Sequence, residues 1–372
     1  MKVTIERNAL LKTLNHVQSV VERRNTIPIL SNVLVEASNG ELKLTATDLD
    51  IEIIESTKAQ IDEAGGTTLP AHLMYDIVRK LPDGAQAELE KTETDGQFSL
   101  YSGRSRFQLQ SLPADDFPNL TAGTMTHGFS LEAADLKRLL EKTRFAISTE
   151  ETRYYLNGIY LHEAETEAGP VLRAVATDGH RLARIDMDLP EGAAGMPGII
   201  VPRKSVLELH KLLENPEGLV EISLSEAKIR FVINGIILTT KLIDGSFPDY
   251  QRVIPSQNDK TLELDADIFA QAVDRVATVS SEKGRAVKLA ISPGKLVLSV
   301  NNPDSGSAME EIAVTYDAES LEVGFNARYL SDITAQIESG QALFKLADSG
   351  APALVSDRED ARAIYVLMPM RV

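Results

Sequence analysis

The histidines are the side chains of this chain with the widest range of chemistry, and His180 stands in the most suggestive setting. It follows Asp178 by two residues in the segment ATDGHRLAR. Together with a remote serine, these two residues would supply the groups of a Ser-His-Asp catalytic triad. No serine, however, stands on a G-x-S-x-G turn that would strain and expose it. We favour the alternative, in which Asp178 and Gly179 make a turn and His180 is a surface residue. The sequence therefore predicts no catalytic residue and no enzyme.

Metal and cofactor chemistry is not indicated either. The six histidines, at positions 16, 72, 127, 162, 180 and 210, include no pair at the spacing of two ligands on one helix turn. The chain has no cysteine, which excludes thiolate metal sites and cysteine nucleophiles. Phosphate-loop, dinucleotide-binding and H-E-x-x-H patterns are also missing from the sequence. We expect no cofactor and no metal.

Short amphipathic segments with apolar residues at i, i+3 and i+4 recur along the chain and form two families. The first family comprises LPAHLMYDIVRKL (69–81), VPRKSVLELHKLL (201–213) and FNARYLSDITAQI (325–337). The second comprises RNALLKTLNHVQSVV (7–21), AADLKRLLEKTRFAI (133–147) and DADIFAQAVDRVATV (265–279). A repeat of this kind, at a period of roughly 125 to 130 residues, predicts three similar domains, each with two helices.

Two further pairs of similar segments support the repeat. LKLTATDLD (42–50) is similar to LRAVATDGH (172–180), and ADDFPNL (114–120) is similar to DGSFPDY (244–250). Between the helices, polar and apolar residues alternate as in half-buried antiparallel strands, with turn signals such as SNGE, LPDG and SPGK. We therefore expect an α+β fold of three tandem domains (1–125, 126–253 and 254–372), each with two helices on one face of about eight antiparallel strands.

Charge is unevenly distributed between these elements. The chain carries a formal charge of −17, which is the wrong sign for a simple nucleic-acid binder. The helical stretches nevertheless sum to +7 when they are counted over residues 7–24, 72–80, 133–146, 203–213, 267–277 and 326–337, so the remainder carries −24. One explanation is that helices often carry Lys and Arg at solvated positions. The alternative is an acidic exterior with a basic helical surface that contacts DNA phosphates without reading sequence.

The composition favours a water-soluble protein of the cytoplasm. Hydrophobic residues make up 43% of the chain, and no apolar run approaches the length of a membrane span. The opening MKVTIERNAL lacks the apolar core of a signal peptide. We expect a cytoplasmic location and no membrane partner.

Over its whole length the sequence resembles the bacterial sliding clamp family, the beta subunit of the replicative DNA polymerase III holoenzyme. The segments that carry the resemblance are TIPILSNVLVEA (26–37), ATDLDIEI (46–53), SGRSRFQLQSLPADDFPNL (102–120), RYYLNGIYL (153–161), VATDGHRLA (175–183), IIVPRKSV (199–206), KLIDGSFPDYQRVIP (241–255) and YVLMPMRV (365–372). The resemblance implies the DNA clamp fold, in which a homodimer closes a ring of six domains around duplex DNA, with helices lining the hole. It implies a processivity factor that slides without sequence specificity.

Crude geometry agrees with two chains per ring. A domain of this size approximates a sphere roughly 35 Å across, so three in a ring leave a hole of about 5 Å and six leave about 35 Å. A duplex is roughly 20 Å across. One chain is therefore too small to encircle DNA, whereas two suffice.

The resemblance also implies particular sites. A pocket between the second and third domains would dock short peptides of the replicative polymerase, the clamp loader, and other polymerases and repair proteins. Its residues would be Arg153, Tyr155, Leu156, Thr177, Gly179, His180, Arg181, Leu182, Pro248, Arg252, Val253, Val366, Met368, Pro369, Met370 and Arg371. The four arginines among them would rim the pocket and take acidic or carbonyl groups of the peptide. DNA contacts would come from Lys12, Arg24, Lys137, Arg203 and Lys204. The dimer interface would pair Phe107 and Leu109 with Thr278 and Val279.

Some positions depart from the family pattern. His72 and Leu73 stand where a basic pair is familiar, Pro352 stands where a small polar residue edges the pocket, and the terminal residue is Val372. A different class of function stays open from the residues alone: a repeat-built scaffold that binds protein partners without encircling DNA. Retention on closed circular DNA, with loss from linear DNA, separates the two.

Overall fold

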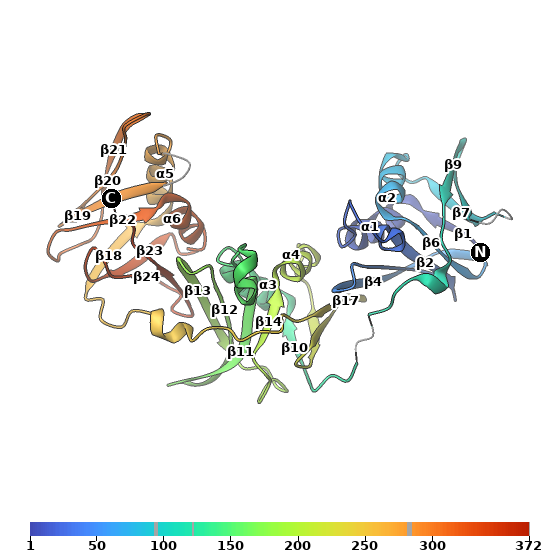
Figure 1. The fold of residues 1–372 in the computed structure, drawn as a ribbon, viewed down its shortest axis with the longest axis horizontal. Helices are drawn as coiled ribbons and strands as arrows, with labels where there is room; N and C mark the ends of the chain where they lie inside the picture. The colour runs from blue at the N-terminus through green and yellow to red at the C-terminus, as the bar shows by residue number, and fades with distance from the viewer. Residues whose placement is uncertain (93–95, 121–122, 281–284, 372) are drawn as a thin grey trace. The chain divides into compact units, whose positions relative to one another are not determined.

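The computed structural model describes residues 1–92, 96–120, 123–280 and 285–371 (Figure 1). The chain forms two compact units. Unit one contains residues 1–137, 190–193 and 204–242, and unit two contains residues 138–189, 194–203 and 243–372. Within the described residues, no helix combines the length and the apolar character needed to cross a membrane.

The same order of elements occurs three times. The first third runs β1 (Lys2–Glu6), α1 (Arg7–Gln18), β2 (Asn32–Ser38), β3 (Glu41–Thr47), β4 (Ile51–Lys58), β5 (Gln60–Glu63), β6 (Gly65–Pro70), α2 (Ala71–Lys80), β7 (Gln86–Lys91), β8 (Gln97–Ser102) and β9 (Ser105–Gln110). The second runs β10 (His127–Glu132), α3 (Ala133–Arg144), β11 (Gly158–Thr166), β12 (Gly169–Thr177), β13 (Arg181–Asp188), β14 (Ile199–Pro202), α4 (Arg203–Leu212), β15 (Leu219–Leu224), β16 (Lys228–Ile233) and β17 (Ile236–Lys241). The third runs β18 (Lys260–Asp265), α5 (Ala266–Ala277), β19 (Ala286–Ser292), β20 (Lys295–Asn302), β21 (Gly306–Ala313), β22 (Leu321–Asn326), α6 (Ala327–Thr334), β23 (Gln341–Leu346), β24 (Ala353–Asp357) and β25 (Ala363–Leu367).

Each helix is thus preceded by one strand and followed by at least three. The strand before a helix pairs with the strands that follow the other helix of the same third: β1 pairs with β7, and β6 pairs with β2. The same exchange joins β10 to β15, β14 to β11, and β18 to β23, and β22 pairs with β19. The two halves of each third are therefore interlocked by backbone hydrogen bonds.

The antiparallel strands form two sheets in each unit. In unit one the orders are β5-β1-β7-β8-β9 and β10-β15-β16-β17-β4-β3-β2-β6, and in unit two they are β14-β11-β12-β13-β25-β24-β23-β18 and β21-β20-β19-β22. In each eight-stranded sheet, a strand that comes third after one helix pairs with a strand that comes third after another helix. These pairs are β4 with β17 and β13 with β25. β9 and β21, which come third after α2 and α5, each pair with a neighbour on one side only. Each is therefore the edge strand of its sheet.

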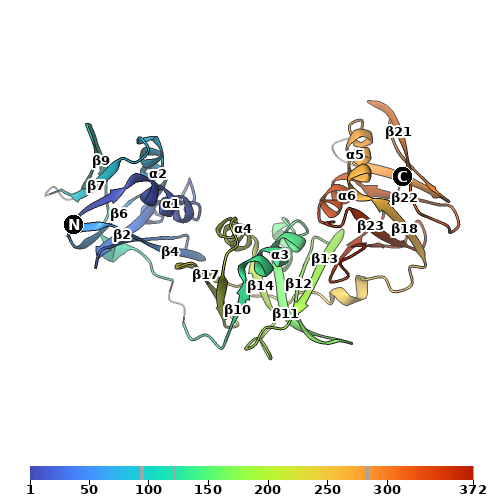
Figure 2. The same cartoon turned by 180° about the vertical axis from the view of Figure 1, so that it is seen from behind.

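The helices bury the apolar face that their sequence spacing predicts. In α1 the buried residues are Leu10, Thr13, Leu14 and Val17, at helical spacing. The helices of a third lie side by side, α1 with α2 and α5 with α6 (Figures 1 and 2). The α+β class and the two helices per third are confirmed. The helices of the first family begin two residues later than the expected segments, because 69–70, 201–202 and 325–326 still belong to strands.

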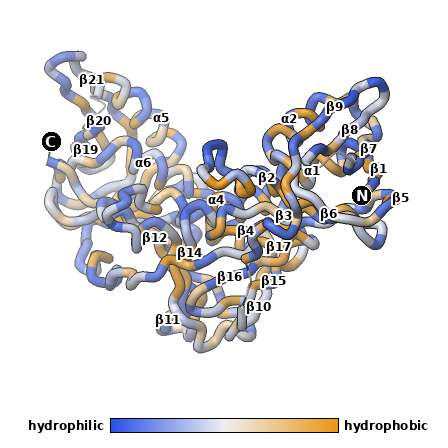
Figure 3. The backbone as a smooth tube through the Cα atoms, turned by 45° about the vertical axis from the view of Figure 1, so that its right-hand side comes forward, coloured by the Kyte–Doolittle hydropathy of each residue, from blue (hydrophilic) through white to orange (hydrophobic). Residues whose placement is uncertain are grey.

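The strands follow the expected alternation, which Figure 3 displays as a change of hydropathy along the backbone. In β23, for example, Ala342, Phe344 and Leu346 are buried while the residues between them are more exposed. At the other end of the chain, Met1 is 6% exposed and its ammonium pairs with Glu63 at 3.3 Å, since β1 lies inside its sheet.

Candidate functional site

An apolar cluster in unit two lies where three distant stretches of chain meet. Its buried members are Val175 of β12, Leu182 of β13, Val366 of β25, and Tyr250, which lies outside the strands. Tyr160, Phe247, Ile254 and Leu354 pack against it. Two apolar side chains of the neighbouring segments are exposed, Val253 by 48% and Met368 by 39%. We name the surface formed by these segments the apolar groove, after the peptide groove expected there: residues 153–156, 177–182, 248–253 and 366–371.

The turn between β12 and β13 forms one part of this groove. The Asp178 carboxylate accepts hydrogen bonds from the backbone N–H groups of His180 (2.9 Å) and Arg181 (3.0 Å). Gly179 has a φ of +89°, and a Cβ there would lie 2.5 Å from Nη1 of Arg153. Asp178 and Gly179 therefore make a turn with His180 exposed, as expected. Because the carboxylate is used within the turn, the triad alternative has no support in the structure.

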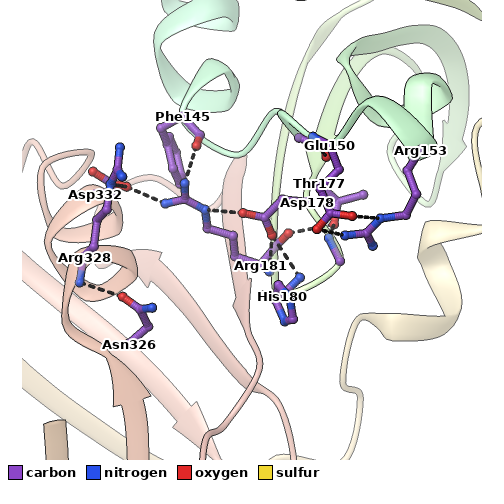
Figure 4. A network of polar contacts seen from close by, with 12 residues as sticks. Phe145, Glu150, Arg153, Thr177, Asp178, His180, Arg181, Asn326, Arg328 and Asp332 are labelled. Carbon is purple, nitrogen blue, oxygen red and sulfur yellow. Dashed lines mark hydrogen bonds and ion pairs between the residues drawn. The ribbon is translucent and has the colours of Figure 1, made fainter. Parts of the chain in front are cut away.

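Arg181 is buried between the β12–β13 turn and α6, and Figure 4 shows its contacts with Asp178 and Asp332. Its side chain is 8% exposed and lies between the rings of Phe145 (5.3 Å) and Tyr329 (4.3 Å). The guanidinium donates to Asp178, to Asp332 of α6 and to the carbonyl of Phe145, at 2.5 to 3.0 Å. The expectation that Arg181 is available to a peptide is corrected on this ground. Its position fastens the turn to α6.

The other three arginines expected at the rim are accessible. Arg153 is partly exposed and pairs with Glu150 at 2.7 Å. Arg252 is exposed and pairs with Asp249 at 2.7 Å, and Arg371 is exposed. The structure brings the expected groove residues to neighbouring segments of one unit, and the backbone N–H of Met368 donates to the carbonyl of His180 at 2.9 Å. Val372 lies outside the described residues.

A polar network supports Tyr250, at the start of the short 3-10 helix that carries Arg252 and Val253. The Nδ1–H of His162 donates to the Glu163 carbonyl (2.6 Å), which leaves Nε2 to accept from the Tyr250 hydroxyl (3.0 Å). The Tyr250 oxygen accepts from Arg173 (3.2 Å), and Arg173 is held by both oxygens of Asp186 at 2.6 and 2.8 Å.

The charge states of this network follow from its surroundings. Burial lowers the pKa of His162, and the nearby Arg173 cation lowers it further, so the ring is neutral near pH 7. Burial alone would lower the pKa of Arg173, but its hydrogen bonds to Asp186 and Tyr250 outweigh burial and raise that pKa. The network was not predicted from the sequence. The similarity of residues 114–120 to 244–250 was the available signal for Tyr250.

The residues expected to contact DNA differ in how free they are. Lys12, Arg24 and Arg203 are exposed. In unit one, the ammonium of Lys204 pairs with Asp48 and donates to the carbonyl of Val20 at 3.0 Å. Lys137 donates to the carbonyl of Glu214 at 3.3 Å. Lys204 is thus held by internal contacts, in contrast to its neighbour Arg203.

The residues expected at the dimer interface belong to different units: Phe107 and Leu109 to unit one, and Thr278 and Val279 to unit two. Phe107 and Leu109 belong to the edge strand β9, Phe107 being half-buried and Leu109 buried. Thr278 and Val279 directly follow α5. The carbonyl of Val279 accepts from the side chain of Asn302, at the end of β20, at 3.0 Å.

Comparison with known proteins identifies the family. Models of the DNA polymerase III beta subunit match residues 1–121 (N-terminal domain), 130–249 (central domain) and 251–371 (C-terminal domain). The beta sliding clamps of Caulobacter vibrioides and Escherichia coli are 55% and 41% identical to the chain, each with full coverage of both proteins.

Solved structures agree. A sliding clamp from Bartonella birtlesii bound to griselimycin has a TM-score of 0.97 at 55% identity and covers 100% of both chains. A Caulobacter crescentus clamp with polyethylene glycol bound has a TM-score of 0.97, with coverage of 100% of this chain and 99% of that one. Three family domains in tandem, full-length relatives and a matching fold all point to one conclusion: the chain belongs to the bacterial DNA polymerase III beta subunit family, the sliding clamps, which are non-catalytic processivity factors of DNA replication.

Proposed function

We propose that the apolar groove of unit two is the surface through which this clamp holds its polymerases, and that the clamp loader and repair proteins dock there too. The observation that carries the proposal is the exposure of Val253 and Met368 beside a buried apolar cluster. An exposed apolar surface flanked by charged residues is typical of a protein-binding site. The griselimycin and polyethylene glycol bound to the solved relatives are consistent with ligand binding in this family.

The chemistry of the groove defines the peptide that fits. A partner would insert one or two large apolar side chains beside Leu156, Val253 and Met368. The flexible thioethers of Met368 and Met370 can repack around different side chains, which suits several partners. Arg153 and Arg252 already pair with carboxylates of their own segments, so an acidic group of the peptide can replace these. Pro352 is proposed to lie at the edge of the groove without contacting the peptide. Its carbonyl accepts a hydrogen bond from the side chain of Asn258 at 2.9 Å.

We further propose the contacts of the ring itself. Within the chain, third strands pair with each other at β4–β17 and β13–β25. The two strands in this position that lack a second neighbour are β9 and β21. The same kind of pairing would therefore join β9 of one copy to β21 of its partner. This places Phe107 and Leu109 beside the segment after α5 that holds Thr278 and Val279. It also covers both open edges, which proteins otherwise protect against uncontrolled pairing.

The DNA surface is proposed to consist of Lys12, Arg24, Lys137, Arg203 and Lys204, which contact backbone phosphates without reading bases. Exposed Lys12, Arg24 and Arg203 are available for direct contact, whereas Lys204 first has to leave Asp48. The joints between domains are proposed near residues 125 and 253. The cytoplasm, where bacterial DNA replication takes place, is the proposed location.

Deletion of the last five residues, Met368 to Val372, tests the groove. We expect loss of binding to a polymerase-derived peptide, measured by fluorescence anisotropy, because Met368 and Met370 leave the surface. The dimer should remain, as measured by sedimentation, since β25 ends before the deletion. Wild-type peptide affinity in the truncated protein would remove the C-terminal segment from the site.

A further inference from the structure

A hollow of unit two shares the β12–β13 turn with the apolar groove. It encloses about 350 Å³. Four segments line it: residues 144–150 at the end of α3, residues 178–181 of the turn, Arg203 at the start of α4, and residues 328–332 of α6. We call it the arginine pocket. Figure 4 shows the side of the pocket formed by the turn and α6.

One of its four arginines is neutralised by the protein. Arg181 forms ion pairs with Asp178 (3.0 Å) and Asp332 (2.5 Å), which are two of the three carboxylates that line the pocket. The third, Glu150, pairs with Arg153 of the apolar groove at 2.7 Å. Every carboxylate of the pocket therefore already has a cationic partner.

In the described part of the chain, the other three guanidiniums have no carboxylate within hydrogen-bonding distance. Among the residues that the structure describes, Arg144 and Arg203 have no hydrogen bond or ion pair from their side chains. Arg328 approaches only Asp332, at 3.9 Å, and is 67% exposed. Three cations from α3, α4 and α6 thus line one hollow whose carboxylates, Glu150, Asp178 and Asp332, are already paired with Arg153 and Arg181. This arrangement is repulsive unless an external anion joins it.

We propose that the arginine pocket binds a backbone phosphate of DNA between Arg144, Arg203 and Arg328. A guanidinium donates two parallel hydrogen bonds to the oxygens of a phosphate, and three of them can surround one phosphate group. The proposal deepens the proposed function, because it rests on Arg203 as a DNA contact. It adds Arg144 and Arg328, neither of which the sequence singled out.

The arginine pocket lies next to the apolar groove. Asp178, His180 and Arg181 line the pocket, and the stretch 178–181 to which they belong is also part of the apolar groove. The phosphate therefore sits within one turn of the segment that a partner peptide contacts. DNA held here passes the docking surface at a fixed distance, so the pocket sets where the duplex lies relative to the tethered polymerase.

The test uses the full-length dimer with Arg144, Arg203 and Arg328 all changed to Gln. Binding of a short blunt duplex, which the ring cannot retain topologically, is followed by fluorescence anisotropy between about 50 and 200 mM salt. We expect affinity to fall roughly tenfold at low salt, and the slope of log affinity against log salt to decrease by about 1, as for one lost phosphate contact. Arg328→Gln alone, an exposed change that leaves folding intact, should give part of the same loss.

A charge-matched control changes Lys288, Arg358 and Arg362, three ion-paired cations of unit two outside the pocket, to Gln. Equal DNA affinity in the pocket variant and the wild type would overturn the proposal, as would an equal loss in the control. Complete competition by millimolar inorganic phosphate would assign the pocket to free phosphate and overturn it for DNA. The affinity of the polymerase peptide is measured in parallel. Its absence in the wild type would refute the docking groove and leave the pocket result unaffected.

Discussion

At the scale of single residues, the groove depends on side chains that never reach its surface. Tyr250 holds Arg252 and Val253 in place through the hydroxyl that it shares between His162 and Arg173. The exposed members of the proposed site could be expected from the sequence, since turn and terminal residues with apolar neighbours are visible there. It did not predict the buried supports, because a hydrogen bond between residues 162 and 250 leaves no periodic signal.

The first prediction concerns pH. The pKa of His162 is lowered in the fold from its ordinary 6.5 by burial, so the unfolded chain takes up the proton more readily. Stability is therefore fully present above about pH 7 and falls as the pH drops below 6.5 towards the folded pKa. In His162→Gln, whose amide can accept from Tyr250 and donate to Glu163, this component should vanish. Thermal unfolding at pH 7.5 and 5.5 measures it, and an unchanged pH dependence in the variant would contradict the assignment.

The second prediction concerns Gly179. A left-handed φ costs a residue with a Cβ roughly 1 to 2 kcal/mol, and the new methyl would also displace the guanidinium of Arg153. Gly179→Ala should therefore lower both the free energy of unfolding and the affinity for a polymerase peptide. Gly40→Ala is the matched control: its φ is +79°, with no atom within 4 Å of the added Cβ. The control should lose stability alone, and equal peptide affinity in the two variants would show that Arg153 is not a contact.

At the scale of elements, the sequence predicted helices and strands well and their pairing poorly. Amphipathic spacing located all six α-helices among the described residues, with ends displaced by at most three residues. The exchange of strands between the halves of each third was not predicted, because alternation shows which face of a strand is buried and not which neighbour it takes. The repeat did establish that whatever topology one third adopts, the others share.

The third prediction tests the open edges. Met309 of β21 is 77% exposed, an unusual setting for an apolar side chain on an edge strand. If β21 pairs with β9 of the partner, Met309→Gln should weaken the dimer, measured by sedimentation at low concentration. Leu219→Gln is the control, because Leu219 is 58% exposed on β15, which already has neighbours on both sides. A dimer constant that shifts equally in both variants would argue against this edge.

At the scale of the whole molecule, the acidic chain and its DNA-related function are reconciled by where the cations lie. The family assignment rules out the scaffold that never meets DNA, and the excess of −24 outside the helices keeps the remainder of the protein from adhering to nucleic acid. For contact with DNA, exposed arginines without a protein partner therefore matter more than the total charge of the chain.

The fourth prediction follows. Arg24 and Lys12 are exposed in unit one, so changing both to Glu should reduce loading onto circular DNA and its salt dependence while leaving the dimer intact. Lys204→Glu should behave differently: it places a second carboxylate beside Asp48 and lowers the stability of unit one. Loading assays on nicked circles, with thermal unfolding of each variant, separate the two effects. Loading equal to the wild type in the double variant would remove both residues from the DNA surface.

The burial of Met1 has a practical consequence for anyone who wishes to watch this protein work. An affinity tag left at Met1 would have to force open the contact with Glu63 and the strand behind it. An amine-reactive dye would spare that position for the same reason. Because the natural chain has no cysteine, a single one introduced at the exposed hairpin tip Gly103 becomes the only thiol in the protein. A fluorophore there would lie next to β9 and report the opening and closing of the ring.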